Sequence, residues 1–171
     1  MRGGANVRDL SSMARKKIVH CHRNSREPIM IVQFYGITFD APVGWEDITD
    51  DLPAGSPPTI AKASGVSAVQ FSIAKYRSGK KPNADFGVLR SFMLEFCQKN
   101  SIDSKHIWAK KFNNTMCVGV FSKTEKQLLA AWYLSDGNNF ALVTYISLDE
   151  EQHLMDEELE EARKIVSSIS F

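Results

Sequence analysis

The fold is decided by the stretch Leu128-Leu129-Ala130-Ala131-Trp132-Tyr133-Leu134-Ser135-Asp136-Gly137-Asn138-Asn139-Phe140-Ala141-Leu142-Val143-Thr144-Tyr145-Ile146. Two apolar runs of strand length flank Asp136-Gly137, a pair that accepts the positive φ of a tight hairpin turn. Both runs are apolar on both of their alternating faces, and strands of that kind lie in the middle of a covered sheet. The stretch therefore predicts a central antiparallel hairpin with a layer of structure on each side.

The residues on the N-terminal side of this hairpin predict further strands. An Asn113-Asn114 turn separates two of them, so that 104–147 is expected to form a meander. Turn residues dominate 50–58, which is predicted to be an exposed loop. The segments with strand-like patterns are 29–40 (broken at Gly36), 66–76, 106–112 and 116–121.

Two segments have the periodicity of amphipathic helices. The first, 84–99, is predicted to begin after Asn83 as its N-cap. The second begins at a capping box made by Ser147 and Glu150. The two apolar stripes are Phe86, Leu89, Met93 and Phe96 in the first helix, and Met155, Leu159, Ala162, Val166 and Ile169 in the second. Strands and helices together predict an α+β fold, in which an antiparallel β-sheet is covered by two amphipathic helices.

Charge divides the chain of 171 residues into two parts. Lys and Arg number 21 against 20 Asp and Glu, but residues 1–28 hold seven of the bases and two of the acids, which leaves a net charge of −4 for 29–171. We expect 1–28 to be a basic, flexible leader and 29–171 to be a single α+β domain. Two other interpretations stay open: an arm that contacts nucleic acid or a membrane surface, and a start codon assigned upstream of a true beginning at Met30.

The remaining composition predicts a cytoplasmic protein. No apolar block of secretory-signal length follows the basic leader, and the longest apolar run, 128–134, is far shorter than the roughly 20 residues of a membrane helix. The charge balance argues against direct nucleic-acid binding, which needs a basic excess. Three cysteines, Cys21, Cys97 and Cys117, cannot all pair with one another and match no zinc module, so free thiols in a reducing compartment are expected.

No motif in the sequence predicts catalysis. Ser135-Asp136-Gly137 lacks the first glycine of a nucleophile elbow, and Gly79-Lys80-Lys81 lacks two residues of a phosphate loop. His20-Cys21-His22 has no distant partner to close a metal site. We therefore expect no catalytic residue, no cofactor and no metal; a deep polar pocket around His106 or Cys117 would instead favour an enzyme.

Three stretches together resemble a known family. They are the turn Pro42-Val43-Gly44-Trp45 after an opening strand pair, the strand Gln70-Phe71-Ser72-Ile73-Ala74 before a basic turn and a helix, and the hairpin from Trp132-Tyr133 to Asp136-Gly137 before a strand and a final helix ending Ile165-Val166-Ser167-Ser168-Ile169. Over residues 31–171 the chain resembles the Mog1/PsbP-like α/β/α sandwich family, which includes DcrB-like bacterial proteins. The resemblance implies that fold and a non-enzymatic binding role.

Two roles are implied by this resemblance. The first is an immunity protein that binds and neutralises a cognate bacterial toxin, where an acidic surface would cover a toxin site built for nucleic acid or a nucleotide. The alternative is a chaperone for a secreted effector of the type VI or Rhs kind, which predicts a large exposed apolar groove. A merely solvated acidic helix face explains the same charges more simply. Oligomeric state is not predicted, and the expected partner-binding residues are Trp45, Asp47, Asp50, Asp51, Trp108, Glu150, Glu151, Glu157 and Glu158.

Overall fold

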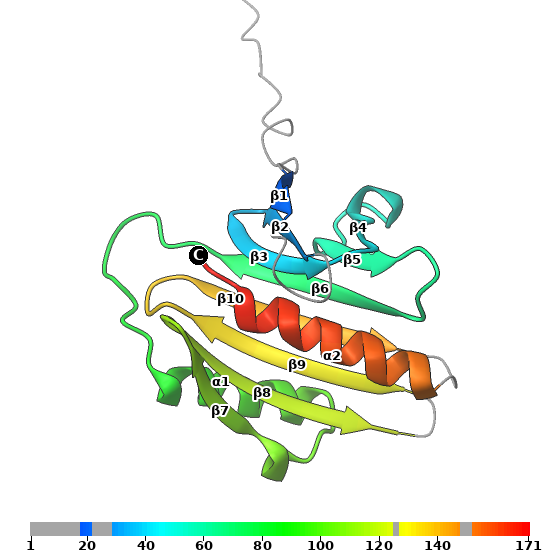
Figure 1. The fold of residues 1–171 in the computed structure, drawn as a ribbon. Coiled ribbons are helices and arrows are strands. Elements are labelled where there is room, and N and C mark those ends of the chain that lie inside the picture. The colour runs from blue at the N-terminus through cyan, green and yellow to red at the C-terminus, as the bar shows by residue number, and fades with distance from the viewer. Residues whose placement is uncertain (1–17, 22–28, 125–126, 148–151) are drawn as a thin grey trace, which may run out of the picture.

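The computed structural model describes residues 18–21, 29–124, 127–147 and 152–171. Within them the chain forms two β-sheets and two α-helices (Figure 1). The strands are β1 (Ile18–Cys21), β2 (Ile29–Phe34), β3 (Ile37–Pro42), β4 (Trp45–Asp47), β5 (Thr59–Lys62), β6 (Ser67–Ala74), β7 (Trp108–Phe112), β8 (Thr115–Lys123), β9 (Leu128–Ser135) and β10 (Phe140–Ser147). The helices are α1 (Phe86–Lys99) and α2 (Gln152–Ser168), and short 3-10 turns lie at Thr49–Asp51 and Ser104–His106.

The larger sheet has seven antiparallel strands in the order β4-β5-β6-β10-β9-β8-β7. Its second half is the predicted meander, because β7 to β10 each pair with their neighbour in the chain. β9 and β10 pair in unbroken register, and β6 then pairs along the whole of β10. The predicted central hairpin is confirmed, since both of its strands have a further strand on the outer side.

The turn between β9 and β10 is longer than the pair Asp136-Gly137. Gly137 has the positive φ that the sequence predicts, 101°, but the connection spans 136–139. Asp136 organises it by accepting hydrogen bonds from the main-chain N–H groups of Asn138 and Asn139, at 2.9 and 2.8 Å. The side chain, rather than a two-residue turn, therefore closes this hairpin.

A smaller sheet, in the order β1-β2-β3, packs on the same face as α2. Its β2–β3 hairpin turns at Tyr35-Gly36, both with positive φ (46° and 90°), which matches the break predicted at Gly36. β1 lies within the expected leader and pairs antiparallel with β2. β3 runs beside the end of α2, where Thr38 and Ser170 exchange two main-chain hydrogen bonds at 2.9 and 2.8 Å.

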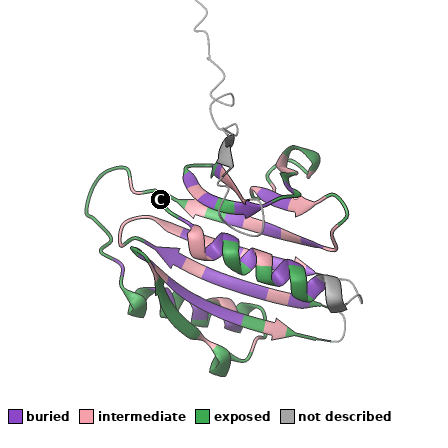
Figure 2. Cartoon of the chain, viewed as in Figure 1, coloured by how far each residue is buried: buried purple, intermediate pink, exposed green. Residues whose placement is uncertain are grey.

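The face that carries α2 is closed by this helix and the β2–β3 hairpin together (Figures 1 and 2). Their buried side chains form one core with β6, β9 and β10. Near its middle the rings of Phe34, Phe39 and Phe71 pack with centroids 5.3 to 6.0 Å apart. Every residue of the predicted stripe from Met155 to Ile169 is buried, which confirms the docking predicted for the second helix.

The opposite face is covered over part of its width. α1 packs on β8 and β9, with Leu89, Met93 and Cys97 buried beneath it. The residues of β10 that face this side alternate with buried ones and stay partly exposed. The sequence predicts that both faces of 140–146 are buried, and the structure confirms full burial for the α2 face only. A helix is about 10 Å wide and strands lie about 4.8 Å apart, so one helix covers roughly two strands.

Some details differ from the sequence predictions. Residues 45–47 and 59–62 form β4 and β5, strands too short to show an alternating pattern. The N-cap of α1 is Asp85, whose carboxylate accepts a first-turn N–H at 2.9 Å; Asn83 instead has a positive φ of 48° in the preceding turn. His106 lies in a 3-10 turn and not in a strand. Neither described helix is both long and apolar enough to cross a bilayer.

Candidate functional site

The structure places Trp45 in the core. Its side chain is 3% exposed, and its indole N–H donates to Glu161 Oε2 at 2.7 Å. The same carboxylate group also holds Lys62 Nζ, at 2.9 Å from one oxygen and 2.7 Å from the other. Trp45 thus joins β4 to α2, because a buried indole is stable where its N–H finds an acceptor. It is not the exposed contact residue that the sequence predicts.

Glu158 is buried as well, with 4% exposure. Its carboxylate accepts a hydrogen bond from the Ser67 hydroxyl and another from the Val66 N–H at 3.3 Å. Gly65 lies directly against it, since a Cβ at this position would stand 2.6 Å from Glu158 Oε1. The carboxylate fastens α2 to the loop before β6. Glu158 is therefore a structural group, not an exposed partner contact.

Among the described residues of α2, the acidic side chains do not form one surface. Residues three apart share a helix flank, and Glu158 and Glu161 both point toward β5 and β6. Glu157 and Glu160 are exposed. Glu150 and Glu151 lie outside the described residues, so their expected role stays a prediction.

The predicted acidic loop lies at one edge of the sheet. Asp47 ends β4 and accepts the Thr49 N–H at 3.0 Å, and Asp50 and Asp51 follow in the 3-10 turn. All three aspartates are exposed. Trp108 lies on β7, at the other edge of the seven-stranded sheet. The structure thus separates the predicted contact residues into two areas.

Trp108 lines a groove between α2 and β7–β9. Its side chain is 38% exposed. Gly119 on β8 lies directly opposite it, and Trp132 on β9 lies opposite Gly119 on the other side. A Cβ at Gly119 would stand 2.5 Å from Trp108 and 2.8 Å from Trp132. Both indoles lie against residue 119, and they fit there only because it has no side chain. Sequence reasoning found Trp108 and missed Gly119, although an isolated glycine within a strand was an available signal.

The groove has a volume of about 290 Å³, an aromatic floor and a charged rim. Phe112 extends the floor, and Lys110 Nζ lies 5.2 Å from the centroid of its ring. On α2, Arg163 pairs with Glu160 at 3.2 Å. An aromatic floor within a polar rim is the arrangement that holds an anchoring side chain of a protein partner.

A second accessible apolar area lies beside α1 on the other face. Val88 and Phe92 are each 37% exposed, and the Phe92 ring packs on Tyr133 and Phe140 with centroids 5.7 and 5.9 Å apart. Leu142 on β10 continues the row and is partly buried. We name these five residues the α1-side surface. The sequence did not single them out, because their spacing is also that of core residues.

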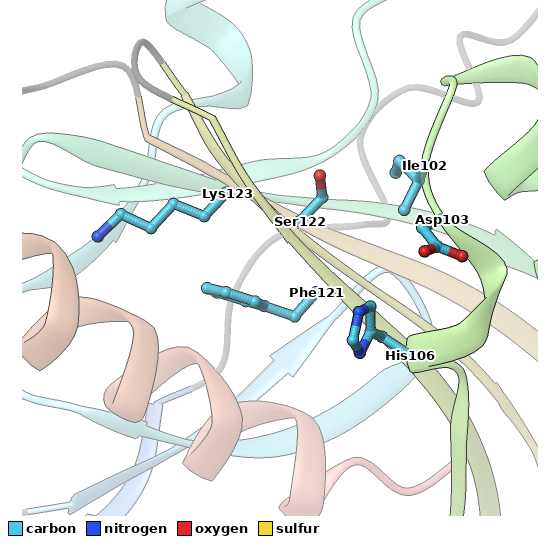
Figure 3. A pocket seen from close by; sticks show the side chains of 6 residues that line it. All are labelled: Ile102, Asp103, His106, Phe121, Ser122 and Lys123. Atoms are coloured by element: carbon cyan, nitrogen blue, oxygen red, sulfur yellow. The ribbon is translucent and has the colours of Figure 1, made fainter.

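A cleft lies at the edge of β8 (Figure 3). Asp103, His106 and Ser122 are among its lining residues and are the residue types of a hydrolytic triad. The Asp103 carboxylate instead accepts the Lys105 N–H at 3.0 Å and lies 3.9 Å from its ammonium group. Within the described residues no hydrogen bond joins the three side chains. This structure therefore does not assemble the nucleophile, base and orienting acid of such a site.

Cys97 and Cys117 are core groups. Both are buried free thiols. Burial raises the pKa of the Cys117 thiol to about 12, and burial, followed by the charge of Asp103, raises the pKa of Cys97. Both thiols are therefore protonated and poor nucleophiles. In the part of the chain that the structure describes, no three potential metal ligands come together.

Comparison with known proteins identifies the fold. No protein-family model and no curated protein matches the chain. The solution structure of cyanobacterial PsbP (CyanoP) from Synechocystis sp. PCC 6803 is similar, with a TM-score of 0.52 and 14% identity over 89% of this chain and 97% of that one. A crystal structure from Bacteroides thetaiotaomicron has a TM-score of 0.54 and 10% identity over 78% of this chain, which spans 44% of that longer protein. The fold is a PsbP/Mog1-like sandwich, and identities this low show the fold alone.

Proposed function

We propose that this chain is a non-enzymatic protein-binding module. The groove at Trp108 carries the proposal, because it presents a half-exposed indole on a rigid sheet, supported from below by Gly119 and Trp132. Tryptophan anchors contribute much of the binding energy at protein interfaces. A site built on strands and a helix keeps its geometry before the partner arrives.

Within that class, we propose that the chain is a cytoplasmic immunity protein that neutralises a cognate bacterial toxin. Support comes from exposed negative charge at Asp47, Asp50, Asp51 and Glu157, and from the net charge of −4 over 29–171. Complementary charge would speed association with a basic toxin surface. The partner is a protein, and neither nucleic acid nor a membrane is needed for the interaction.

The test requires the cognate toxin domain, which the immunity role predicts to be encoded beside this gene in its native host; the absence of such a neighbour would contradict that role. Calorimetry with the purified full chain should show a complex, and co-expression should restore growth to cells that make the toxin. Trp108→Ala should weaken the complex by about 30-fold, the effect of a strong interface anchor. Tyr35→Ala is the matched control, since Tyr35 is an aromatic residue with the same 38% exposure outside the groove. An unchanged affinity in Trp108→Ala would exclude the groove as the binding site.

A second role is favoured by the α1-side surface. Its half-exposed rings suit the apolar helices of an unfolded or partly folded secreted effector, which a chaperone would shield. We would then expect the effector to be soluble only when co-expressed with this chain, and Phe92→Glu to abolish that effect. Phe92→Glu should leave toxin protection intact if the immunity role is correct. Retained solubilisation by Phe92→Glu would contradict the chaperone role.

A further inference from the structure

β8 extends beyond the end of its neighbour β7. The ladder between the two strands stops at the Trp108–Gly119 pair, whereas β8 stays paired with β9 as far as Lys123–Leu128. The chain before Trp108 does not continue the ladder, because it forms the 3-10 turn Ser104–His106. Within the described residues, 120–123 therefore has a strand partner on one side only.

Phe121 directs its main-chain groups toward this open side. The N–H of Thr124 donates to the carbonyl oxygen of Gln127 at 2.9 Å, so the main chain of Thr124 faces the β9 side of the hairpin. Main-chain groups alternate between the two sides of an antiparallel strand, and the register of β8 with β9 is unbroken. Three residues before Thr124, the N–H and C=O of Phe121 therefore point away from β9. Its ring is 37% exposed.

The neighbouring outer edge carries the stronger block against added strands. β7 has Lys110 and Lys111 at its centre, and lysines on an edge strand are a common device that prevents pairing with another chain. The open part of β8 has one lysine, Lys123, at its end and the Phe121 ring before it. The main chain at Phe121 is therefore the less protected of the two edges.

A cleft with a volume of about 460 Å³ lies beside this edge. In Figure 3, Ile102, Asp103 and His106 lie on one side of the β8 strand, and the Phe121 ring points toward the other side. The edge of a second sheet would meet the 3-10 turn, whereas a single strand needs only about 4.8 Å of lateral space. The four residues 120–123 offer roughly 13 Å of strand length, enough for a short segment.

We propose that this cleft binds one extended segment of a protein partner by strand addition to β8, with an apolar side chain of the segment against Phe121. The inference rests on the proposed protein-binding function and names a second contact within it. Hydrogen bonds to the Phe121 main chain would supply affinity, and the Phe121 ring would supply preference for an apolar residue. The charged lining includes Asp103 and Lys123, of opposite sign, so net charge does not set the preference.

The experiment selects ligands from a random nine-residue peptide library displayed on phage, with the purified full chain as bait. Affinities of the enriched peptides are then measured by fluorescence anisotropy. Phe121→Pro removes the outward N–H and the ring, and proline is tolerated on an edge strand. It should weaken binding by about tenfold or more, the loss expected for one hydrogen bond together with an apolar contact. Phe121→Thr keeps the N–H and should have a smaller effect.

Ala109→Pro is the matched control. Gly119 and Trp108 are paired across β8 and β7, and their main-chain groups point toward each other. Because main-chain groups alternate in direction along a strand, the N–H of the next residue, Ala109, points outward on the edge that carries the lysines. This proline should leave peptide affinity unchanged. If Phe121→Pro does not fold, protection of the Phe121 amide from hydrogen exchange by bound peptide provides the same test in the wild-type chain.

The outcomes separate this inference from the proposed function. The strand-addition site would be overturned if no peptide is enriched. It would also be overturned if the enriched peptides leave the Phe121 amide unprotected and bind Phe121→Pro normally. Toxin binding that persists in Phe121→Pro alongside either result would leave the protein-binding role intact. Peptides that require Phe121, combined with no toxin complex, would support the cleft and contradict the immunity assignment.

Discussion

At the scale of single residues, the structure buries a carboxylate where the helix pattern predicts a solvated acid. Burying a charge is costly unless hydrogen bonds replace its water. Ser67 and Val66 provide those bonds to Glu158, and Gly65 leaves the space for the carboxylate. The donors are 91 and 92 residues away in sequence. A helix periodicity cannot show whether such a distant loop is present, so the inward position of Glu158 could not be predicted.

Removing this carboxylate should destabilise the fold. Glu158→Ala leaves the Val66 N–H and the Ser67 hydroxyl without their acceptor, and we expect the free energy of unfolding to fall by about 2–3 kcal/mol. Urea unfolding monitored by circular dichroism measures the change. Glu157→Ala, the exposed neighbour on the same helix, should change it by less than about 0.5 kcal/mol. Equal effects of the two substitutions would show that the contacts of Glu158 contribute no stability.

Asp136 should titrate below its ordinary value. Burial alone would raise the pKa of this carboxyl, but hydrogen bonds from Asn139 and Asn138 outweigh burial and lower the pKa below 3.8. Because the pKa is lower in the folded state, the ionised carboxylate stabilises the fold at pH values above its unfolded-state pKa. This contribution is lost as the pH falls through the folded-state pKa. NMR titration of the Asp136 carboxyl should give a midpoint under 3.8. Asp136→Asn should weaken the acid dependence of stability; a midpoint at or above the ordinary value would contradict the hydrogen-bonded turn.

At the scale of elements, periodicity was sufficient where segments were long. The two helices, the 128–146 hairpin and the strand at 66–76 were predictable, because each contains several repeats of its pattern. β4 and β5 contain three and four residues, and they form because β6 offers an edge to β5, which in turn pairs with β4. The groove at Trp108 was half predictable: an aromatic residue beside Lys110 and Lys111 indicated an edge strand, but the approach of Trp132 depends on cross-strand register.

Filling the space at Gly119 should disturb the groove. Gly119→Ala places a Cβ against both indoles, so we expect a loss of about 1–3 kcal/mol in unfolding free energy from overpacking. The partner's affinity should fall as well, because Trp108 must move. Adding Trp108→Ala removes one of the two clashes, and the double variant should therefore be more stable than the sum of the single effects predicts. Strict additivity, measured by chemical denaturation, would show that the indole and the new methyl group do not compete.

At the scale of the whole molecule, the sandwich has unequal sides. α2 and the β2–β3 hairpin close one face, while α1 covers part of the other (Figure 2). Resemblance to a family and alternating apolar strands were enough to predict the layers. They did not show that a helix and a hairpin share one face, since that depends on where the first strands fold back across the sheet. The α1-side surface follows from this unequal coverage, whereas the groove lies between α2 and the β7 edge and the cleft lies at the edge of β8.

Hydrogen exchange should report the order of the strands in the larger sheet. Amides of β6, β9 and β10 should exchange most slowly, because these strands are paired on both sides within the sheet and open only with global unfolding. Amides of β4 and of the outer side of β7 should exchange by local fraying. Native-state exchange with NMR detection checks the order. Faster exchange in β10 than in β7 would contradict the central position of the hairpin.

The different exposure of the three tryptophans also gives the molecule an internal fluorescence reporter. Trp45 and Trp132 are sealed from water, whereas Trp108 is half exposed, so solvent-sensitive changes in emission come chiefly from one ring. A molecule bound over the Trp108 ring would change the wavelength and intensity of the Trp108 emission. A molecule bound on the other face of the sheet would leave the Trp108 ring in contact with water. Unlabelled protein can thus reveal which side of the sheet has been occupied.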